Sequence, residues 1–300
     1  MPPEEVGKRA TTVAQMIEKL KCMGTSEGEQ RGLAFQPNPS DVIISPYAKS
    51  GTTWLQQMVH SLRTRGGMDF TEITEVVPWL EMAHDLGLHL AESQKWTPRA
   101  YKSHLPWPLV PKGAKYIYAF RDPKDVVISF YHFFEDFFFE RGAFSIREFA
   151  EDFFLQREPP MRYWYHIATW WAQKDNPDVL LLSFEEMKAN LPETIRRVAA
   201  FIDIELDDEL FEITLQNSSY NFMKEHETHF NESLTLAYME QNCGNPAGGT
   251  SSKVRAGQTA AHKQELPEDI SAQMDAIWHK EIAQPLGLDS YQDLWDVLKY

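Results

Sequence analysis

Short apolar runs alternate with longer segments of helical periodicity along this chain. Apolar runs bounded by polar or turn residues predict strands at residues 42–45, 99–103, 115–120 and 178–183. Apolar positions that recur every three or four residues predict helices at 11–23, 53–65, 124–139, 145–154, 161–173, 191–202 and 267–282. Short buried strands separated by helices are typical of a parallel sheet covered on both faces. We therefore expect an α/β fold, a single domain with a central parallel sheet flanked by helices.

Two segments, residues 1–40 and residues 229–252, depart from this alternation of strands and helices. Residues 1–40 hold one predicted helix and then Gly, Pro and polar residues, so we expect a peripheral lead-in to a domain at 41–300. Residues 229–252 end in small and polar residues, and at this length we predict an irregular loop that serves as a flexible lid. No apolar run approaches the ~18 residues that span a bilayer, and the N-terminus lacks an apolar signal core.

Amino-acid composition and charge limit which molecules this protein is expected to bind. The chain has 300 residues, 43% of them hydrophobic, which indicates a packed globular protein. The 29 Lys and Arg face 44 Asp and Glu, and no basic run is long enough to bind nucleic acid. This acidity mildly favours a neutral or cationic substrate. Only two cysteines occur, Cys22 and Cys243, which argues against a disulfide framework and for a reducing, cytoplasmic location without a membrane partner.

The segment after the first strand predicts a loop that binds an anion. The strand ends at Ser45, and a turn with Gly51 leads into a helix, so backbone N–H groups and the helix dipole face one point. Lys49 adds a cation, and hydroxyl donors come from Ser50, Thr52 and Thr53. The common nucleotide-triphosphate loop places its Lys after the last Gly, whereas Lys49 precedes it. A kinase-like loop remains open on this motif alone.

Two further strand ends carry candidate chemistry. Arg121 directly follows the strand at 115–120, a helix begins just after it, and Ser129 lies about two turns along that helix. Lys102 lies near the end of the strand predicted at 99–103, and His104 directly follows that strand. A histidine suits a general base, because its ordinary pKa lies near neutrality.

These motifs together resemble the cytosolic-type sulfotransferases, a family with a P-loop-kinase-like fold that uses 3′-phosphoadenosine 5′-phosphosulfate (PAPS). Residues 47–54 are similar to the family's 5′-phosphosulfate loop, P-K-S-G-T-T-W, with Ala48 in place of the Pro. Arg121 and Ser129 match the signature that holds the 3′-phosphate. Residues 251–263 resemble the R-K-G-x-x-G-D-W-K motif, which implies further 3′-phosphate contacts from Arg255, Ala256 and Gly257, although Ala256 replaces a Lys.

The resemblance also implies roles at the adenine and at the reacting group. Trp54 matches the family's stacking residue, Phe184 stands in the position of a Tyr, and Ser218 in that of a Thr. His104 lies in a K-S-H-L-P segment whose His is the family's general base. Lys49 is then placed to stabilise the leaving oxygen, and Lys102 to contact the transferred sulfonate.

Further segments resemble those that line the family's acceptor pocket or its dimer interface. The acceptor candidates are Trp79, Met82, Phe133 and Phe137, any of which could instead be core aromatics or core apolar residues. The family's C-terminal dimer motif, K-x-x-x-T-V-x-x-x-E, is not matched after Lys263. We therefore expect a monomer or a dimer built on another surface.

The interpretation is an enzyme that transfers a sulfonate from PAPS to a hydroxyl or amine of a small molecule, without a metal, and releases adenosine 3′,5′-bisphosphate (PAP). Two alternatives stay open. The changes at Ala256 and at residues 260–262 are compatible with a degenerate module that binds the cofactor without turnover. A nucleotide kinase on a related fold is the other. The sequence leaves phenols, steroids, alcohols, amines and alkaloids all possible as acceptors.

Overall fold

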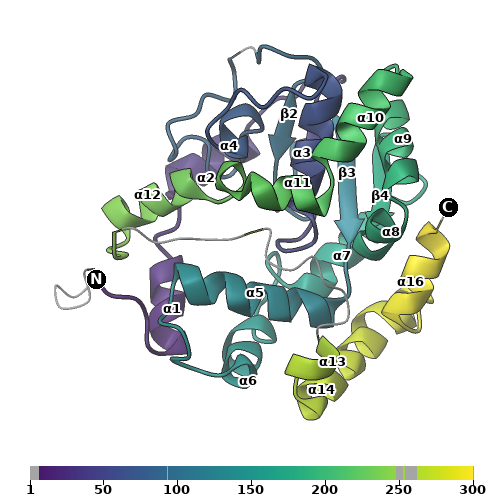
Figure 1. Ribbon diagram of the computed structural model, residues 1–300. Coiled ribbons are helices and arrows are strands. Elements are labelled where there is room, and N and C mark those ends of the chain that lie inside the picture. The colour runs from purple at the N-terminus through teal and green to yellow at the C-terminus, as the bar shows by residue number, and fades with distance from the viewer. Residues whose placement is uncertain (1–6, 93, 248–252, 254–261, 300) are drawn as a thin grey trace.

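A four-stranded parallel sheet lies at the centre of the protein, which we describe from a computed structural model covering residues 7–92, 94–247, 253 and 262–299 (Figure 1). The strands are β1 (Val42–Ile44), β2 (Ala100–Lys102), β3 (Lys115–Phe120) and β4 (Val179–Ser183), in the order β2-β1-β3-β4. Every neighbouring pair is parallel, and Ile43 aligns with both Tyr101 and Tyr116. The four predicted strands are confirmed to within one residue at each end.

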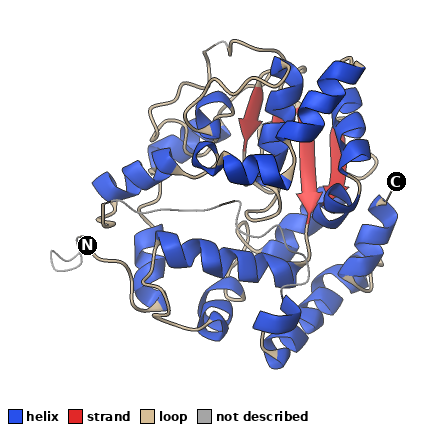
Figure 2. Cartoon of the chain, in the orientation of Figure 1, coloured by secondary structure: helices blue, strands red, loops and turns tan. Residues whose placement is uncertain are grey.

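Helices cover both faces of the sheet (Figure 2). Alternate strand residues enter two separate cores, with Ile43 and Tyr118 in one and Ile44 and Ile117 in the other. The first core includes residues of α5 (Pro123–Phe137) and α7 (Tyr163–Trp171); the second includes residues of α3 (Thr52–Thr64), α9 (Leu191–Phe201) and α10 (Asp208–Asn217). The period-two alternation of strand side chains thus builds the three-layer α/β fold that the sequence predicts.

The remaining helices are mostly short. They are α1 (Val13–Leu20), α2 (Ser26–Leu33), α4 (Ile73–Val76), α6 (Ile146–Phe149) continued by the π-helical η2 (Ala150–Phe154), α8 (Phe184–Ala189), α11 (Tyr220–Glu225), the 3₁₀ turn η3 (Glu227–His229), α12 (Ser233–Asn242), α13 (His262–Glu265), α14 (Glu268–Trp278) continued by the π-helical η4 (His279–Ala283), α15 (Gln284–Leu286) and α16 (Tyr291–Leu298). None of the helices in the described ranges is long and apolar enough to cross a membrane.

The expected irregular loop at 229–252 is wrong for most of its described part. Helix α12 occupies Ser233–Asn242, and its Leu236 and Met239 are buried in the core. The apolar residues of this helix are spread around its axis, so the periodicity that marks an amphipathic helix is missing from the sequence. Residues 248–252 lie outside the described residues, and movement of this segment stays a prediction.

One disulfide is present, although the cysteine count argues against a disulfide framework and for a reducing compartment. Cys22, just after α1, and Cys243, just after α12, form a disulfide with their Cα atoms 5.6 Å apart. The sequence gives no indication of this pairing, because 221 positions separate the two residues and only the tertiary fold brings α1 to α12.

Candidate active site

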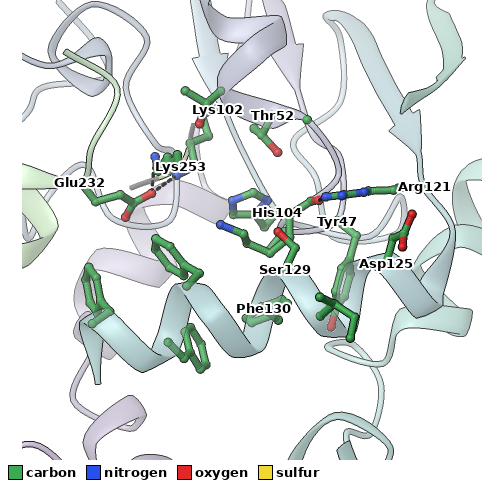
Figure 3. Close-up of a pocket in the computed structure, with 18 of the residues that line it drawn as sticks. Tyr47, Thr52, Lys102, His104, Arg121, Asp125, Ser129, Phe130, Glu232 and Lys253 are labelled. Atoms are coloured by element: carbon green, nitrogen blue, oxygen red, sulfur yellow. Dashed lines mark hydrogen bonds and ion pairs between the residues drawn. The ribbon is translucent and has the colours of Figure 1, made fainter. Parts of the chain in front are cut away.

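The carboxyl ends of the four strands converge on one cavity. In a parallel sheet these ends share an edge, which is where ligands bind in open α/β folds. The loop after β1 carries Lys49, β2 leads to His104, β3 leads to Arg121, and β4 leads to Phe184. All four residues line a cavity of about 590 Å³, whose other walls come from α1, α5, η2 and α11. Figure 3 shows His104 and Arg121 among the residues around this cavity. This volume suits a small-molecule ligand.

The loop between β1 and α3 has the conformation of an anion-binding turn. Lys49 and Gly51 both have positive φ, 71° and 91°, and the Ser50 N–H donates to the Tyr47 carbonyl at 3.1 Å. Such left-handed residues form the concave backbone turns that hold anions. A Cβ at position 51 would lie 3.1 Å from the Phe184 ring, so glycine also allows a close approach there. Arg121 fixes the loop, because its Nη1 donates to the Lys49 carbonyl at 2.6 Å.

Unpaired hydroxyls show that the cavity fits a polar, anionic ligand. Ser50 Oγ, Thr52 Oγ1 and Ser218 Oγ are buried and have no hydrogen-bond partner among the described residues. Buried polar groups in native proteins are almost always paired, so these atoms are suited to a ligand. Ser129 lines the same cavity, as does Thr53. The ligand would meet a concentration of positive charge, because Lys49, Lys102 and Arg121 also line this cavity.

The residues assigned to the adenine lie together at one end of the cavity. The rings of Trp54 and Phe184 meet edge to face with centroids 5.7 Å apart. Trp54 Nε1 donates to the Ser218 carbonyl at 2.7 Å. The guanidinium of Arg121 lies 4.3 Å from the centroid of the Phe184 ring. An aromatic pair beside a cation can hold a purine ring and a phosphate at adjacent positions.

His104 is held in one tautomer. Its Nδ1 lies 2.8 Å from the Pro46 carbonyl, which can only accept a hydrogen bond, so Nδ1 carries the proton and Nε2 is left as a base. The backbone N–H of His104 donates to Glu81 at 2.6 Å, and its carbonyl is bonded by His166 at 3.0 Å. Burial, and next the positive charge of Lys102, holds the pKa of His104 well below its ordinary value. The imidazole is therefore neutral near pH 7.

A buried carboxylate joins two lysines in the cavity, and the sequence motifs gave no sign of it. Glu232 accepts a hydrogen bond from Lys102 at 3.0 Å and forms an ion pair with Lys253 at 2.5 Å (Figure 3). Lys102 also lies 3.9 Å from the centroid of the Trp79 ring. Burial lowers the pKa of Lys102, and Glu232 opposes this shift. The two lysines together hold the pKa of Glu232 well below its ordinary value although its burial acts in the other direction.

Lys49 lies apart from this ion-pair cluster. Its Nζ sits 3.8 Å from the centroid of the Phe133 ring on α5. Burial first, and then the charge of Lys253, lowers the pKa of Lys49 well below its ordinary value. An anionic ligand in this cavity would oppose both effects and favour the charged form.

Three of the four predicted acceptor residues line the cavity, and the fourth does not. Trp79, Phe133 and Phe137 line the cavity, whereas Met82 is buried close to Gly24 and is not among the described residues that line it. The N-terminal lead-in, expected to be peripheral, contributes to the wall through Ile17, Leu20 and Met23 of α1 and the turn after it.

Three candidates for the 3′-phosphate, Arg255, Ala256 and Gly257, lie outside the described residues. Within the described part of the chain, no group of three or more His, Cys, Asp or Glu could hold a metal ion.

A sheet edge that combines an anion-binding loop, cations and a neutral histidine defines a group-transfer enzyme with an anionic donor. Comparisons with known proteins give its family. The family model described as a sulfotransferase domain matches residues 39–285. Sulfotransferase 1B1 of Canis lupus familiaris is 30% identical over 261 residues, which cover 83% of this chain and 86% of that protein. Sulfotransferase 2A1 of Homo sapiens is 34% identical over 214 residues, 68% of this chain and 74% of that protein.

Solved structures show the same fold. Retinol dehydratase in complex with retinol and PAP matches with a TM-score of 0.67 at 21% identity, covering 89% of this chain and 86% of that one. Mouse sulfotransferase SULT7A1 with PAP matches with a TM-score of 0.65 at 19% identity, covering 88% and 92%. The chain belongs to the PAPS-dependent sulfotransferase family that its motifs resemble, and it is a sulfotransferase.

Proposed function

We propose that this enzyme transfers the sulfonate of PAPS to a hydroxyl or amine of a small-molecule acceptor, with His104 as the general base. The hydrogen bond from Nδ1 to the Pro46 carbonyl carries the proposal, because it leaves a basic Nε2 on a residue that lines the cavity. The low pKa of His104 keeps that nitrogen unprotonated near pH 7. A base of this kind contributes about 10²–10⁴-fold to turnover.

The residues present fit the nucleotide in three groups. The 5′-phosphosulfate would be held by the loop residues Lys49, Ser50, Gly51, Thr52 and Thr53. The 3′-phosphate would be held by Arg121 and Ser129, together with Arg255, Ala256 and Gly257. The adenine would be held by Trp54, Phe184 and Ser218. The support is the set of unpaired hydroxyls and cations around one cavity. The bound nucleotide supplies the sulfonate and a good leaving group.

The chain's own residues then supply proton transfer and charge stabilisation. His104 Nε2 would accept the proton that the acceptor's hydroxyl or amine loses on in-line attack at sulfur, as the bond to the leaving oxygen breaks. Lys49 would stabilise the negative charge on the leaving oxygen, and Lys102 would contact the sulfonate. Positioned cations in a cavity shielded from water are worth far more than in bulk solvent. Trp79, Phe133 and Phe137 form apolar walls for the acceptor.

The same proposal covers the cellular location of the enzyme, its oligomeric state and the movement of one segment. We place the enzyme in the cytoplasm because its motifs resemble the cytosolic-type family, although the Cys22–Cys243 disulfide removes the argument from the cysteines. We propose a monomer, or a dimer that does not use the family's C-terminal segment. Acceptor entry would be accompanied by movement of the segment around α12, because Glu232 at its start faces the cavity.

An acceptor screen tests the proposal against its two alternatives. The protein is incubated with phenols, alcohols, steroids and amines in the presence of PAPS or of ATP, and products are analysed by mass spectrometry. We expect sulfonated products in the incubations with PAPS and no phosphorylated products in those with ATP. Phosphorylated products formed with ATP would indicate a kinase. Tight binding of PAP with no turnover of any acceptor would indicate the degenerate module.

A further inference from the structure

Arg157 is a cation of the cavity wall that the proposed function does not use. It lies in the loop between η2 and α7, is half-buried, and lines the same cavity as His104. Neither the donor nor the general base needs a positive charge from this loop. Its place among aromatic walls therefore requires a separate explanation.

The backbone around Arg157 is fixed on both sides. Arg162 Nη1 donates to the carbonyls of Arg157, at 3.0 Å, and Leu155, at 3.1 Å, while Arg162 itself pairs with Glu281 at 2.6 Å. On the other side of the loop, the Tyr47 hydroxyl donates to the Met161 carbonyl at 3.1 Å. The guanidinium of Arg157 is thus carried by a loop anchored to η4 and to the anion-binding turn.

The guanidinium of Arg157 contacts two aromatic rings. Its centre lies 4.9 Å from the centroid of Phe153 and 5.9 Å from that of Phe130. No hydrogen bond or ion pair joins its side chain to any residue in the described ranges. Lys102 and Lys253, by contrast, share Glu232. Arg157 therefore keeps its five N–H donors for a ligand while Phe153 and Phe130 stack on it.

The charge of Arg157 reaches the catalytic side of the cavity. It opposes the burial that raises the pKa of Tyr47, and it contributes to the lowered pKa of His166. His166 is in turn bonded to the His104 carbonyl at 3.0 Å. Arg157, Tyr47 and His104 all line the same cavity.

We propose that Arg157 binds a carboxylate carried by the acceptor, on a part of the molecule other than the hydroxyl or amine that is sulfonated. This inference rests on the proposed function. A guanidinium pairs with a carboxylate through two parallel hydrogen bonds, and the aromatic walls shield that pair from water. The net charge of −15 would disfavour an anionic acceptor at long range. Salt screens such long-range repulsion beyond about 8 Å, so the contact inside the cavity decides the preference.

The test compares acids with their methyl esters. Hydroxyaryl carboxylic acids with spacers of increasing length, and the matching esters, are assayed with PAPS, and the ratio of kcat/KM for acid over ester is measured. We expect the best acid to be preferred by about tenfold or more, as for a charge-assisted pair. In Arg157→Gln the ratio should fall to about one, and Arg157→Lys should keep part of it. Lys21→Gln is the matched control, because Lys21 lines the same cavity but is exposed and paired with Glu18.

Each outcome decides the inference separately from the proposed function. Equal losses for acid and ester in Arg157→Gln, or no preference for any acid in the unaltered enzyme, would overturn it. Failure to sulfonate any compound would contradict the proposed function instead. In that case calorimetry of acid and ester binding to the PAP-loaded protein, with and without Arg157→Gln, still measures the carboxylate contact. A preference that survives Arg157→Gln in this measurement would likewise overturn the inference.

Discussion

At the scale of single residues, the site needs opposite protonation states on adjacent groups. His104 acts as a base only when neutral, and burial together with Lys102 lowers its pKa well below the ordinary value. Lys49 stabilises a leaving oxygen only when charged, yet burial lowers its pKa as well. Activity therefore requires a pH above the pKa of His104 and below that of Lys49.

The alkaline limit of this window gives a prediction about Lys49. As pH rises through the lowered pKa of Lys49, its charge is lost, so kcat/KM should decline well below pH 10.5, the ordinary lysine value. Arginine stays charged at all accessible pH values, so Lys49→Arg should move this decline to higher pH. Lys49→Met should lower kcat about 10²–10³-fold, as removal of one stabilising donor does. A pH profile of kcat/KM measures both, and an unmoved limit in Lys49→Arg would assign the decline to another group.

At the scale of elements, the α12 segment is tied to the catalytic strand ends by charge. Glu232, directly before α12, links Lys102 at the end of β2 with Lys253, two residues before Arg255 in the sequence. One carboxylate thus connects the contact proposed for the sulfonate with the residues proposed for the 3′-phosphate. The helix itself is joined to α1 through the Cys22–Cys243 disulfide.

This linkage predicts the effect of Glu232→Gln. Glu232 raises the pKa of Lys102 against burial, and the charges facing Lys102 also include Lys253 and Glu72. Glu232 also raises the pKa of Lys49, so loss of the carboxylate should lower the pKa of both lysines further and move the alkaline decline of kcat/KM to lower pH. Glu232→Asp, which keeps the charge, should shift it less. Removing one partner of a buried ion pair also destabilises the folded protein by about 3–5 kcal/mol, so the melting temperature of Glu232→Gln should be lower than that of the unaltered enzyme. An unshifted pH profile in a folded variant would contradict the linkage.

At the scale of the whole molecule, the sequence predicted whatever depends on local pattern. The strands, the loop at Gly51 and the strand-end positions of His104 and Arg121 were all readable, because each follows from a short run of neighbouring residues. Glu232 and Arg157 were not, since tertiary packing alone brings them to the cavity. The same holds for the Cys22–Cys243 pair and for the wall contributed by α1.

The disulfide gives a prediction for the intact protein. Alkylation of the denatured, unreduced chain should add no label, and alkylation after reduction should label both Cys22 and Cys243. Reduction should also lower the melting temperature, because a cross-link over so long a loop is typically worth about 2–4 kcal/mol. Intact mass spectrometry and thermal melts measure these effects. Two labels without reduction would contradict the pairing, and Cys22→Ser/Cys243→Ser controls for effects of the reductant.

The most direct test of the account separates the chemistry of His104 from nucleotide binding. Two quantities are measured: PAP affinity, and the amount of sulfonated product formed together with an equal amount of PAP. The proteins compared are the unaltered enzyme, His104→Ala and the control His226→Ala. The His226 imidazole is bonded to the Phe222 carbonyl and does not line the cavity. We expect His104→Ala to lower product formation about 10²–10⁴-fold while PAP affinity changes little, and His226→Ala to change neither. Near-normal product formation in His104→Ala would contradict it.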